Sequence, residues 1–292
     1  MMKRLICILM SLAAMISFCA CGEKPSDGLA EGSIDITADN LPKIVSDEHF
    51  GYIGSSLAAA LLRAYSKEKV EGLTESVASS DEAYARLLND ECNIVIGYEP
   101  SEEASAELEN GGISLQTVTV GYDALVFFAS PSNGVTELSP EQLTLIFGGS
   151  IKKWSELGGA DIAVSAFSAS SDSFENAWFK RSFPLETEAA SVQNKLTGDD
   201  GVFTSSVDYD NRPGAIGCSL YSKTPQSGVG GKREMISVDG VLPSDETLKN
   251  GSYPYTKRLV IAARTSFEAD SVTQLVFDWL QSTQGTEFLS RF

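Results

Sequence analysis

Basic residues are scarce in this 292-residue sequence. Its 22 lysines and arginines face 40 aspartates and glutamates, so the formal net charge at pH 7 is −18. An acidic chain argues against nucleic acid and anionic lipid headgroups as partners. His49 is the single histidine, and Gly-x-Ser-x-Gly, Walker-loop and dinucleotide motifs are missing, so a hydrolase or a nucleotide-dependent enzyme has little support. We predict no catalytic residues, no cofactor and no metal site.

Cysteine is also rare, and most of it lies in one place. Three of the five cysteines fall within the first 21 residues. The other two, Cys92 and Cys218, each sit in an apolar run that is typical of a strand. This setting favours inert buried thiols over a disulfide or a metal site.

No apolar run is long enough to span a bilayer. Leu5–Phe18 follows two basic residues and has the length of a signal-peptide core, so residues 1–21 are predicted to be a signal peptide. The run ends in Cys-Ala-Cys-Gly, which is similar to a bacterial lipoprotein processing site with Cys21 as the lipidated residue. Residues 22–32 are polar and rich in Gly, Ser and Pro, as expected of a tether. The mature protein is therefore expected outside the cell, on the outer face of the membrane.

The remaining chain, about 270 residues, is long enough for two hydrophobic cores. Apolar runs alternate with amphipathic helical segments, which predicts an α/β fold. Ser139 to Gln142 reads as a capping box that opens a helix, with proline at its first position. The expected strands are Ile34–Thr37, Leu41–Val45, Asn93–Gly97, Tyr122–Ala129, Ile162–Ala166, Ala215–Leu220 and Leu259–Ala263.

The stretch Ile162–Trp178 predicts a strand, a polar turn and a helix. Ser171, Asp172 and Ser173 fall near the start of that helix, where backbone N–H groups lack intrahelical partners. Such a turn is either a cap that satisfies itself or a cradle for an anion. Serines mark two further junctions, at Ser46 and at Ser79–Ser80, but ordinary capping produces such junctions everywhere, so the three need not converge.

The segment Leu138–Gly159, LSPEQLTLIFGGSIKKWSELGG, resembles phosphate ABC-transporter substrate-binding proteins, which belong to the periplasmic-binding-protein class. Further segments fit the same family in the same order: LPKI, SSDEAYARLLND, YEPSEE, GYDALVFFASPSN, NRPGAIGCSLYS, ISVDGVLPSDETLKNGSYPYTKRLVIAAR and DWLQSTQGTEFL. The resemblance implies two α/β lobes, joined by hinge strands, that close on a ligand in an interlobe cleft. We assign residues 33–123 and a return segment near 256–292 to the first lobe, and residues 124–255 to the second.

The resemblance also implies ligand-binding positions. The family turn that carries Gly-Ser-Thr is matched by Ser46 and the two residues after it, or, in a second register, by Gly54-Ser55-Ser56. The hydroxyl that opens the next helix is matched by Ser80, and the third site by Ser171 and Ser173. Glu99 is either a carboxylate that accepts a proton from the ligand or a solvated turn residue.

The sequence departs from this pattern in its charges. The family arginine is absent, because Phe167 or Ala169 occupies its position. Losing a buried charge partner costs about 3 to 5 kcal/mol, and a bidentate guanidinium is the strongest element of such a site. Asp47, Glu48 and Asp172 would add repulsion. The candidate substitute cations are Arg212, Arg258 and Arg264.

Two functions remain open. The first is a lipid-anchored, monomeric solute-binding protein that delivers phosphate or a similar small oxyanion to the permease of an ABC importer. The second keeps the fold but has a cleft re-purposed for another solute, or serves as a sensor or adhesion module. The acidic residues motivate the second.

Overall fold

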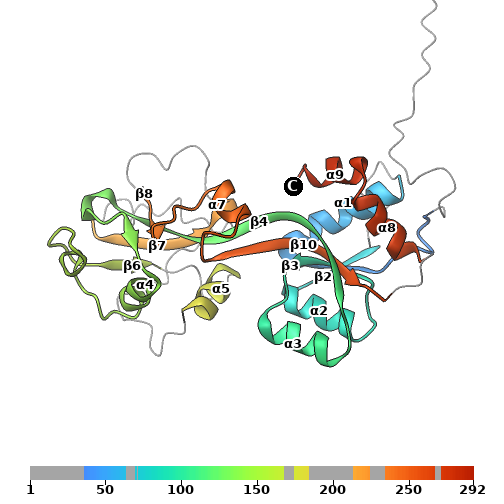
Figure 1. Ribbon diagram of the computed structural model, residues 1–292, viewed down its shortest axis with the longest axis horizontal. Coiled ribbons are helices and arrows are strands. Elements are labelled where there is room, and N and C mark those ends of the chain that lie inside the picture. Colours follow the sequence, from blue (N-terminus) through green and yellow to red (C-terminus); the bar gives the residue numbers. More distant parts are fainter. Residues whose placement is uncertain are drawn as a thin grey trace, which may run out of the picture.

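The computed structural model describes residues 36–63, 70, 72–167, 174–183, 213–223, 234–266 and 271–292. Over these residues the protein is an α/β fold of two lobes that lie side by side (Figure 1). Strands β4 and β10 run between the lobes. The predicted fold class is therefore confirmed.

One continuous path of strands passes through both lobes. Its order is β2-β1-β3-β10-β4-β7-β6, with β8 also pairing to β4, while β5 and β9 form a small parallel pair. β1 is parallel to β2 and β3, and β10 is antiparallel to both β3 and β4. The strands are β1 Ile44–Asp47, β2 Thr74–Val77, β3 Ile94–Tyr98, β4 Leu115–Ala129, β5 Glu137–Leu138, β6 Ser165–Phe167, β7 Ala215–Leu220, β8 Glu234–Met235, β9 Ser237–Val238 and β10 Thr256–Arg264.

Strand β4 belongs to both lobes. Leu115–Ala124 pair with β10, and Leu125–Ala129 pair with β7. The half from Asp123 onward is buried throughout, whereas the first half is mostly half-buried. The apolar run predicted at Tyr122–Ala129 is thus the buried end of a longer strand. The lobe boundaries assigned from the sequence stay a prediction.

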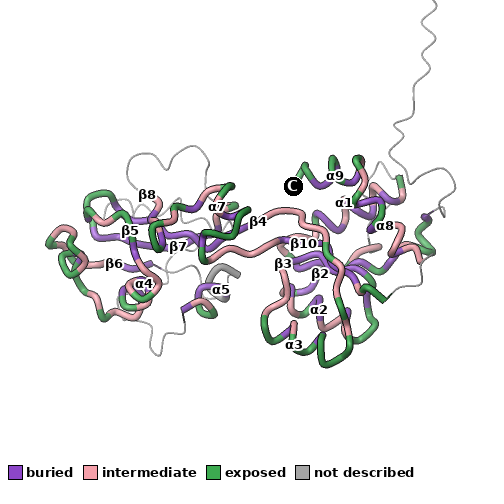
Figure 2. Tube along the Cα trace, viewed as in Figure 1, coloured by how far each residue is buried: buried purple, intermediate pink, exposed green. Residues whose placement is uncertain are grey.

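Helices cover both faces of the sheet in the first lobe. Successive strand residues point to opposite faces, so Ile44, Ile94 and Ile96 share one core with α1, while Val45 and Val95 share another with α2 and α3. Figure 2 shows this buried sheet between partly exposed helices. The helices are α1 Gly51–Leu61, α2 Ser80–Leu88, α3 Glu102–Asn110, α4 Pro140–Phe147, α5 Phe174–Ser182, α7 Asp245–Lys249, α8 Val272–Leu280 and α9 Thr283–Leu289.

Serines begin most of these helices. Each accepts a hydrogen bond from a backbone N–H of the first turn, which satisfies one of the donors left over at a helix start. The capping box at Ser139 forms as predicted, with Gln142 returning the bond. The capping serines are Ser79, Ser101, Ser139, Ser244, Ser271 and Ser282. Self-satisfied caps are therefore common in this chain.

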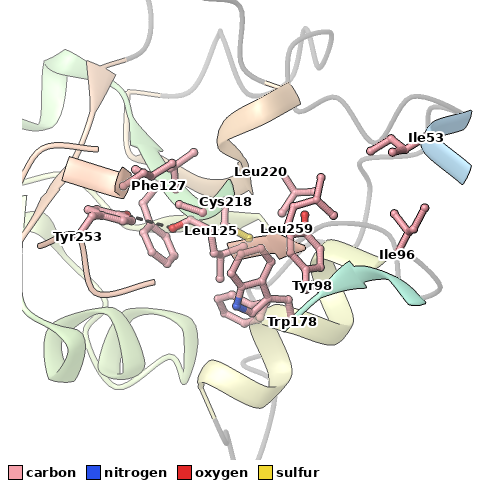
Figure 3. Packing of buried hydrophobic residues seen from close by; sticks show 14 of the residues in the cluster. Ile53, Ile96, Tyr98, Leu125, Phe127, Trp178, Cys218, Leu220, Tyr253 and Leu259 are labelled. Atoms are coloured by element: carbon pink, nitrogen blue, oxygen red, sulfur yellow. Dashed lines mark hydrogen bonds between the residues drawn. The ribbon is translucent and has the colours of Figure 1, made fainter. Parts of the chain in front are cut away.

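Aromatic side chains fill the region where the lobes meet. Tyr98 at the end of β3 lies beside Trp178 of α5, with ring centroids 5.6 Å apart, and Leu259 of β10 packs in the same cluster (Figure 3). Farther into the second lobe, the Tyr253 hydroxyl donates to the Leu125 carbonyl at 3.0 Å. Trp178 is only 3% exposed.

Some sequence expectations need correction. Ile36 and Thr37 lie outside any strand. The strand expected at Leu41–Val45 begins at Ile44 and continues to Asp47, so Ser46 lies within a strand and not in a turn. The chain turns only afterwards, in a 3-10 helix over Glu48–Phe50.

The two buried cysteines agree with expectation, since Cys92 and Cys218 are both buried thiols. Burial raises the pKa of Cys92 to about 12, which keeps the thiol protonated and unreactive at neutral pH. A cysteine-based reaction at this position has no support.

Candidate ligand site between the lobes

The candidate site lies where β1 and β3 end. Both strands are parallel and deliver their carboxyl ends to the same edge of the sheet, which is where open α/β sheets bind ligands. The start of α2 borders this edge, and Trp178 of α5 reaches it from the second lobe. Residues from both lobes therefore meet at this edge of the sheet.

Asp47 is the buried centre of this edge, and its side chain is fully inaccessible to solvent. Oδ2 accepts a hydrogen bond from the Ser80 hydroxyl at 2.8 Å. Oδ1 accepts one from the backbone N–H of His49 at 3.1 Å and lies 2.8 Å from His49 Nδ1. The carboxylate thus caps the 3-10 helix and receives the donors that an anion bound here would use.

These contacts shift the pKa values of both partners. Burial alone would raise the pKa of Asp47, but the hydrogen bonds from His49 and Ser80 together outweigh it and lower the pKa. The hydrogen bond to Asp47 raises the pKa of His49 against the opposing effect of burial. Asp47 is therefore ionised at neutral pH, and a negative charge is built into the site.

The hydroxyl of Ser80 makes two hydrogen bonds. It donates to Asp47 and accepts from the backbone N–H of Tyr98 at 2.9 Å. A side chain at Gly97 would place its Cβ 2.7 Å from Ser80 Oγ, so glycine is required there for this approach. The single hydroxyl proton of Ser80 is already used, and an anion would have to compete with Asp47 for it.

Ser46 points to the opposite side of the sheet. Because side chains alternate along a strand, Ser46 shares the α1 face with Ile44, while Asp47 shares the α2 face. The Ser46 hydroxyl is buried and has no hydrogen-bond partner among the described residues. It packs against α1, where a Cβ added to Gly54 would lie 2.5 Å away. Its ligand role stays a prediction.

Glu99 is paired with Arg258. The Arg258 Nε donates to Glu99 Oε1 at 2.8 Å, and a terminal nitrogen contacts the same oxygen. Both side chains are about 40% exposed. Arg264, at the other end of β10, pairs with Asp90 at 2.7 Å. Neither candidate arginine therefore replaces the missing family arginine without giving up a carboxylate.

The remaining candidates lie outside the described residues. They are Cys21, Ser171, Asp172, Ser173 and Arg212. The helix expected after the serine turn forms as α5, whereas the strand expected at Ile162–Ala166 begins three residues later, as β6 Ser165–Phe167.

Sequence reasoning missed several groups at the lobe junction. Lys257 of β10 places its Nζ over the rings of Trp178 and Tyr98, 5.1 and 5.9 Å from their centroids. Asp123 accepts hydrogen bonds from the hydroxyls of Tyr98 at 2.9 Å and Ser222 at 2.7 Å. Both residues are charged groups next to apolar runs in the sequence, and that is the signal by which they could have been found.

One salt bridge also connects the lobes. Arg181 of α5 lies 3.7 Å from Asp81 at the start of α2. Asp81 in turn accepts from the backbone N–H of Ser101. The two lobes are thus in contact through a ring pair and an ion pair.

Two negative findings concern only the part of the chain that the structure describes. No group of three or more His, Cys, Asp or Glu side chains there could hold a metal ion. None of the helices described is both long enough and apolar enough to cross a membrane.

Comparison with known proteins gives consistent matches. A family model described as "PBP superfamily domain" matches residues 54–283. The phosphate-binding protein PstS of Borreliella burgdorferi is 25% identical over 190 residues, which cover 63% of this chain and 65% of the relative. PstS of Bacillus subtilis is 29% identical over 170 residues, 57% of this chain and 51% of the relative. The aligned parts thus span between half and two thirds of these relatives.

Solved structures match over more of their length. An ABC-type phosphate transport receptor from Vibrio cholerae has a TM-score of 0.65 at 19% identity, covering 86% of this chain and 98% of that one. PstS from Borrelia burgdorferi has a TM-score of 0.61 at 22% identity, covering 85% and 96%. At these identities the likeness establishes the shared fold.

Proposed function

The chain belongs to the PBP (periplasmic-binding-protein) superfamily, as its resemblance to phosphate ABC-transporter substrate-binding proteins predicted, and on that premise we propose that it captures a small oxyanion between its lobes. The observation that carries the proposal is the convergence of polar groups and Trp178 at the carboxyl ends of β1 and β3. Phosphate is the first solute to test, because the relatives that match in sequence are phosphate-binding proteins. The capture would serve an ABC importer, with its permease as the partner.

We further propose that the protein is exported and lipid-anchored through Cys21, that it acts as a monomer and that it is not an enzyme. The signal-like residues 1–21 and the polar tether after them support export. In this arrangement the lobes lie outside the cell, beside the permease that receives the solute. A Cys21→Ser variant should move from the membrane fraction to the medium or periplasm, and retention in the membrane would contradict the anchor.

A second candidate function has one specific observation in its favour. The buried carboxylate of Asp47 already accepts a hydrogen bond from the Ser80 hydroxyl, and its lowered pKa keeps it ionised, so the site contains a negative charge of its own. A solute that is neutral or positively charged would not be repelled by it. In that case the cleft is re-purposed, and the protein is a binder or sensor for another class of solute.

Calorimetry separates the two functions. We expect the purified protein to release or absorb heat on titration with inorganic phosphate, and an absence of heat at millimolar phosphate would remove the first function. A thermal-shift screen with anionic, neutral and cationic solutes tests the second. A rise in melting temperature with phosphate and with nothing else would count decisively against a re-purposed cleft.

A further inference from the structure

Most cationic side chains at the lobe junction already have a carboxylate partner. In each pair the basic and the acidic side chain come from two different segments that are neighbours at the junction. The pairs are Arg181 with Asp81, Arg258 with Glu99 and, when its ring is protonated, His49 with Asp47. Each of these cations would have to leave a partner in order to bind a solute.

Lys257 is different. Its ammonium faces the rings of Trp178 and Tyr98, and no carboxylate of the described residues lies within salt-bridge distance of it. Asp123 is opposite Lys257 in the β4–β10 register, but that carboxylate accepts hydrogen bonds from the hydroxyls of Tyr98 and Ser222. Ring faces attract a cation, yet they supply no oxygen for its three N–H donors.

The side chain of Lys257 is half-buried, so these donors have also lost part of their water. Burial, and then the charge of Arg181, lower the pKa of Lys257. The nearby carboxylates of Asp81, Asp47 and Glu99 act in the opposite direction and favour the charged form. A partly desolvated ammonium with unused donors is stabilised by any oxygen that arrives between the lobes.

We propose that Lys257 is the cationic contact of the bound oxyanion. It would take the role that the sequence resemblance gives to an arginine, which this chain lacks at Phe167 and Ala169. The position suits this role, because β10 passes from one lobe to the other and Trp178 brings the second lobe against the ammonium. The inference rests on the proposed function, since it presupposes an anionic solute.

The test compares three variants of the full chain, with inorganic phosphate as the probe. Lys257→Met keeps the length of the side chain and removes its charge, Lys257→Arg keeps the charge, and Lys249→Met is the matched control on an exposed part of α7. By calorimetry we expect Lys257→Met to bind phosphate about 10- to 100-fold more weakly than wild type, the loss of one charged hydrogen-bond donor. The phosphate affinity of Lys257→Arg should stay within about tenfold of the wild-type affinity. The control Lys249→Met should bind phosphate as tightly as wild type.

The melting temperature without phosphate separates binding from a structural role. We expect Lys257→Met to melt at the same temperature as wild type or higher, because it relieves a partly buried charge. A drop of several degrees would mean that the ammonium stabilises the lobe contact, and would overturn the inference.

The binding results separate this inference from the proposed function. Equal phosphate binding by wild type and Lys257→Met would overturn the role of Lys257 and leave the proposed function standing. No phosphate binding by wild type would remove both.

Discussion

Replacing Asp47 with alanine should weaken the fold and strengthen phosphate binding. The carboxylate is fully buried and receives hydrogen bonds from the Ser80 hydroxyl and from the backbone and ring of His49. Removing it leaves these donors without their acceptor. Breaking a buried, charged hydrogen-bond set of this kind costs about 3 to 5 kcal/mol. Unfolding free energies of about 5 to 15 kcal/mol exceed this loss over most of their range, so we expect the variant to fold.

The gain in binding comes from the same change. Without Asp47 the Ser80 hydroxyl can donate to the solute, and a built-in negative charge disappears. Two unit charges about 5 Å apart repel by about 3 kcal/mol at an effective dielectric constant of about 20. Salt and water reduce this figure, so we expect phosphate affinity to rise about tenfold or more.

The measurements are urea unfolding and phosphate calorimetry, both at pH 7. Asp39→Ala is the control, because Asp39 is exposed and its loss changes the net charge by the same amount. The control should shift the free energy of unfolding by about 0.5 kcal/mol or less. If Asp47→Ala binds phosphate more weakly than the control, then Asp47 does not compete with the solute for Ser80, and the reasoning fails.

Two further predictions concern the same strand. Gly54→Ala should lower the free energy of unfolding by about 1 to 3 kcal/mol through overpacking, because its Cβ would lie 2.5 Å from Ser46 Oγ. The higher helix propensity of alanine should offset about 1 kcal/mol of this loss. In a Ser46→Ala background the nearest remaining contacts are 3.6 and 3.8 Å, so there the same change should be stabilising in urea unfolding. The His49–Asp47 contact should stabilise the fold most between pH 3.8 and 6.5, the ordinary pKa values of the two groups. Because the pKa of His49 is raised in the folded protein, its contribution to stability is complete below pH 6.5 and is lost as the pH rises through the pKa of the folded state. Because the pKa of Asp47 is lowered, its contribution is complete above pH 3.8 and is lost as the pH falls through the pKa of the folded state. The difference in melting temperature between wild type and His49→Gln, followed from pH 3 to 9, measures this window.

Additive effects of Gly54→Ala and Ser46→Ala would show that the two side chains do not meet, contrary to the packing described. For the pH profile, a wild-type advantage over His49→Gln that grows steadily above pH 7 would contradict the sign of the shift in His49.

The elements could be predicted where the local pattern is strong. Ala215–Leu220 is a strand with the predicted bounds, and the capping box at Ser139 begins α4. Apolar periodicity and capping depend on neighbours within a few residues, so the sequence contains the whole signal. The side-chain contacts of the site were harder to predict, because Ser80 and Asp47 are 33 positions apart and Glu99 and Arg258 are 159 apart.

The chain by itself determined the alternation of strands and helices and the membership in a two-lobed superfamily, since these follow from local hydrophobic order and from motifs along nearly its whole length. Only the tertiary structure decided what the polar residues do. Strand β1 runs two residues farther than predicted, to Asp47. Because neighbouring side chains of a strand face opposite ways, Ser46 points toward the core under α1 and Asp47 toward the start of α2. The antiparallel crossing of β10 likewise placed Lys257 against a tryptophan from the other lobe, a contact between distant segments that no local pattern encodes.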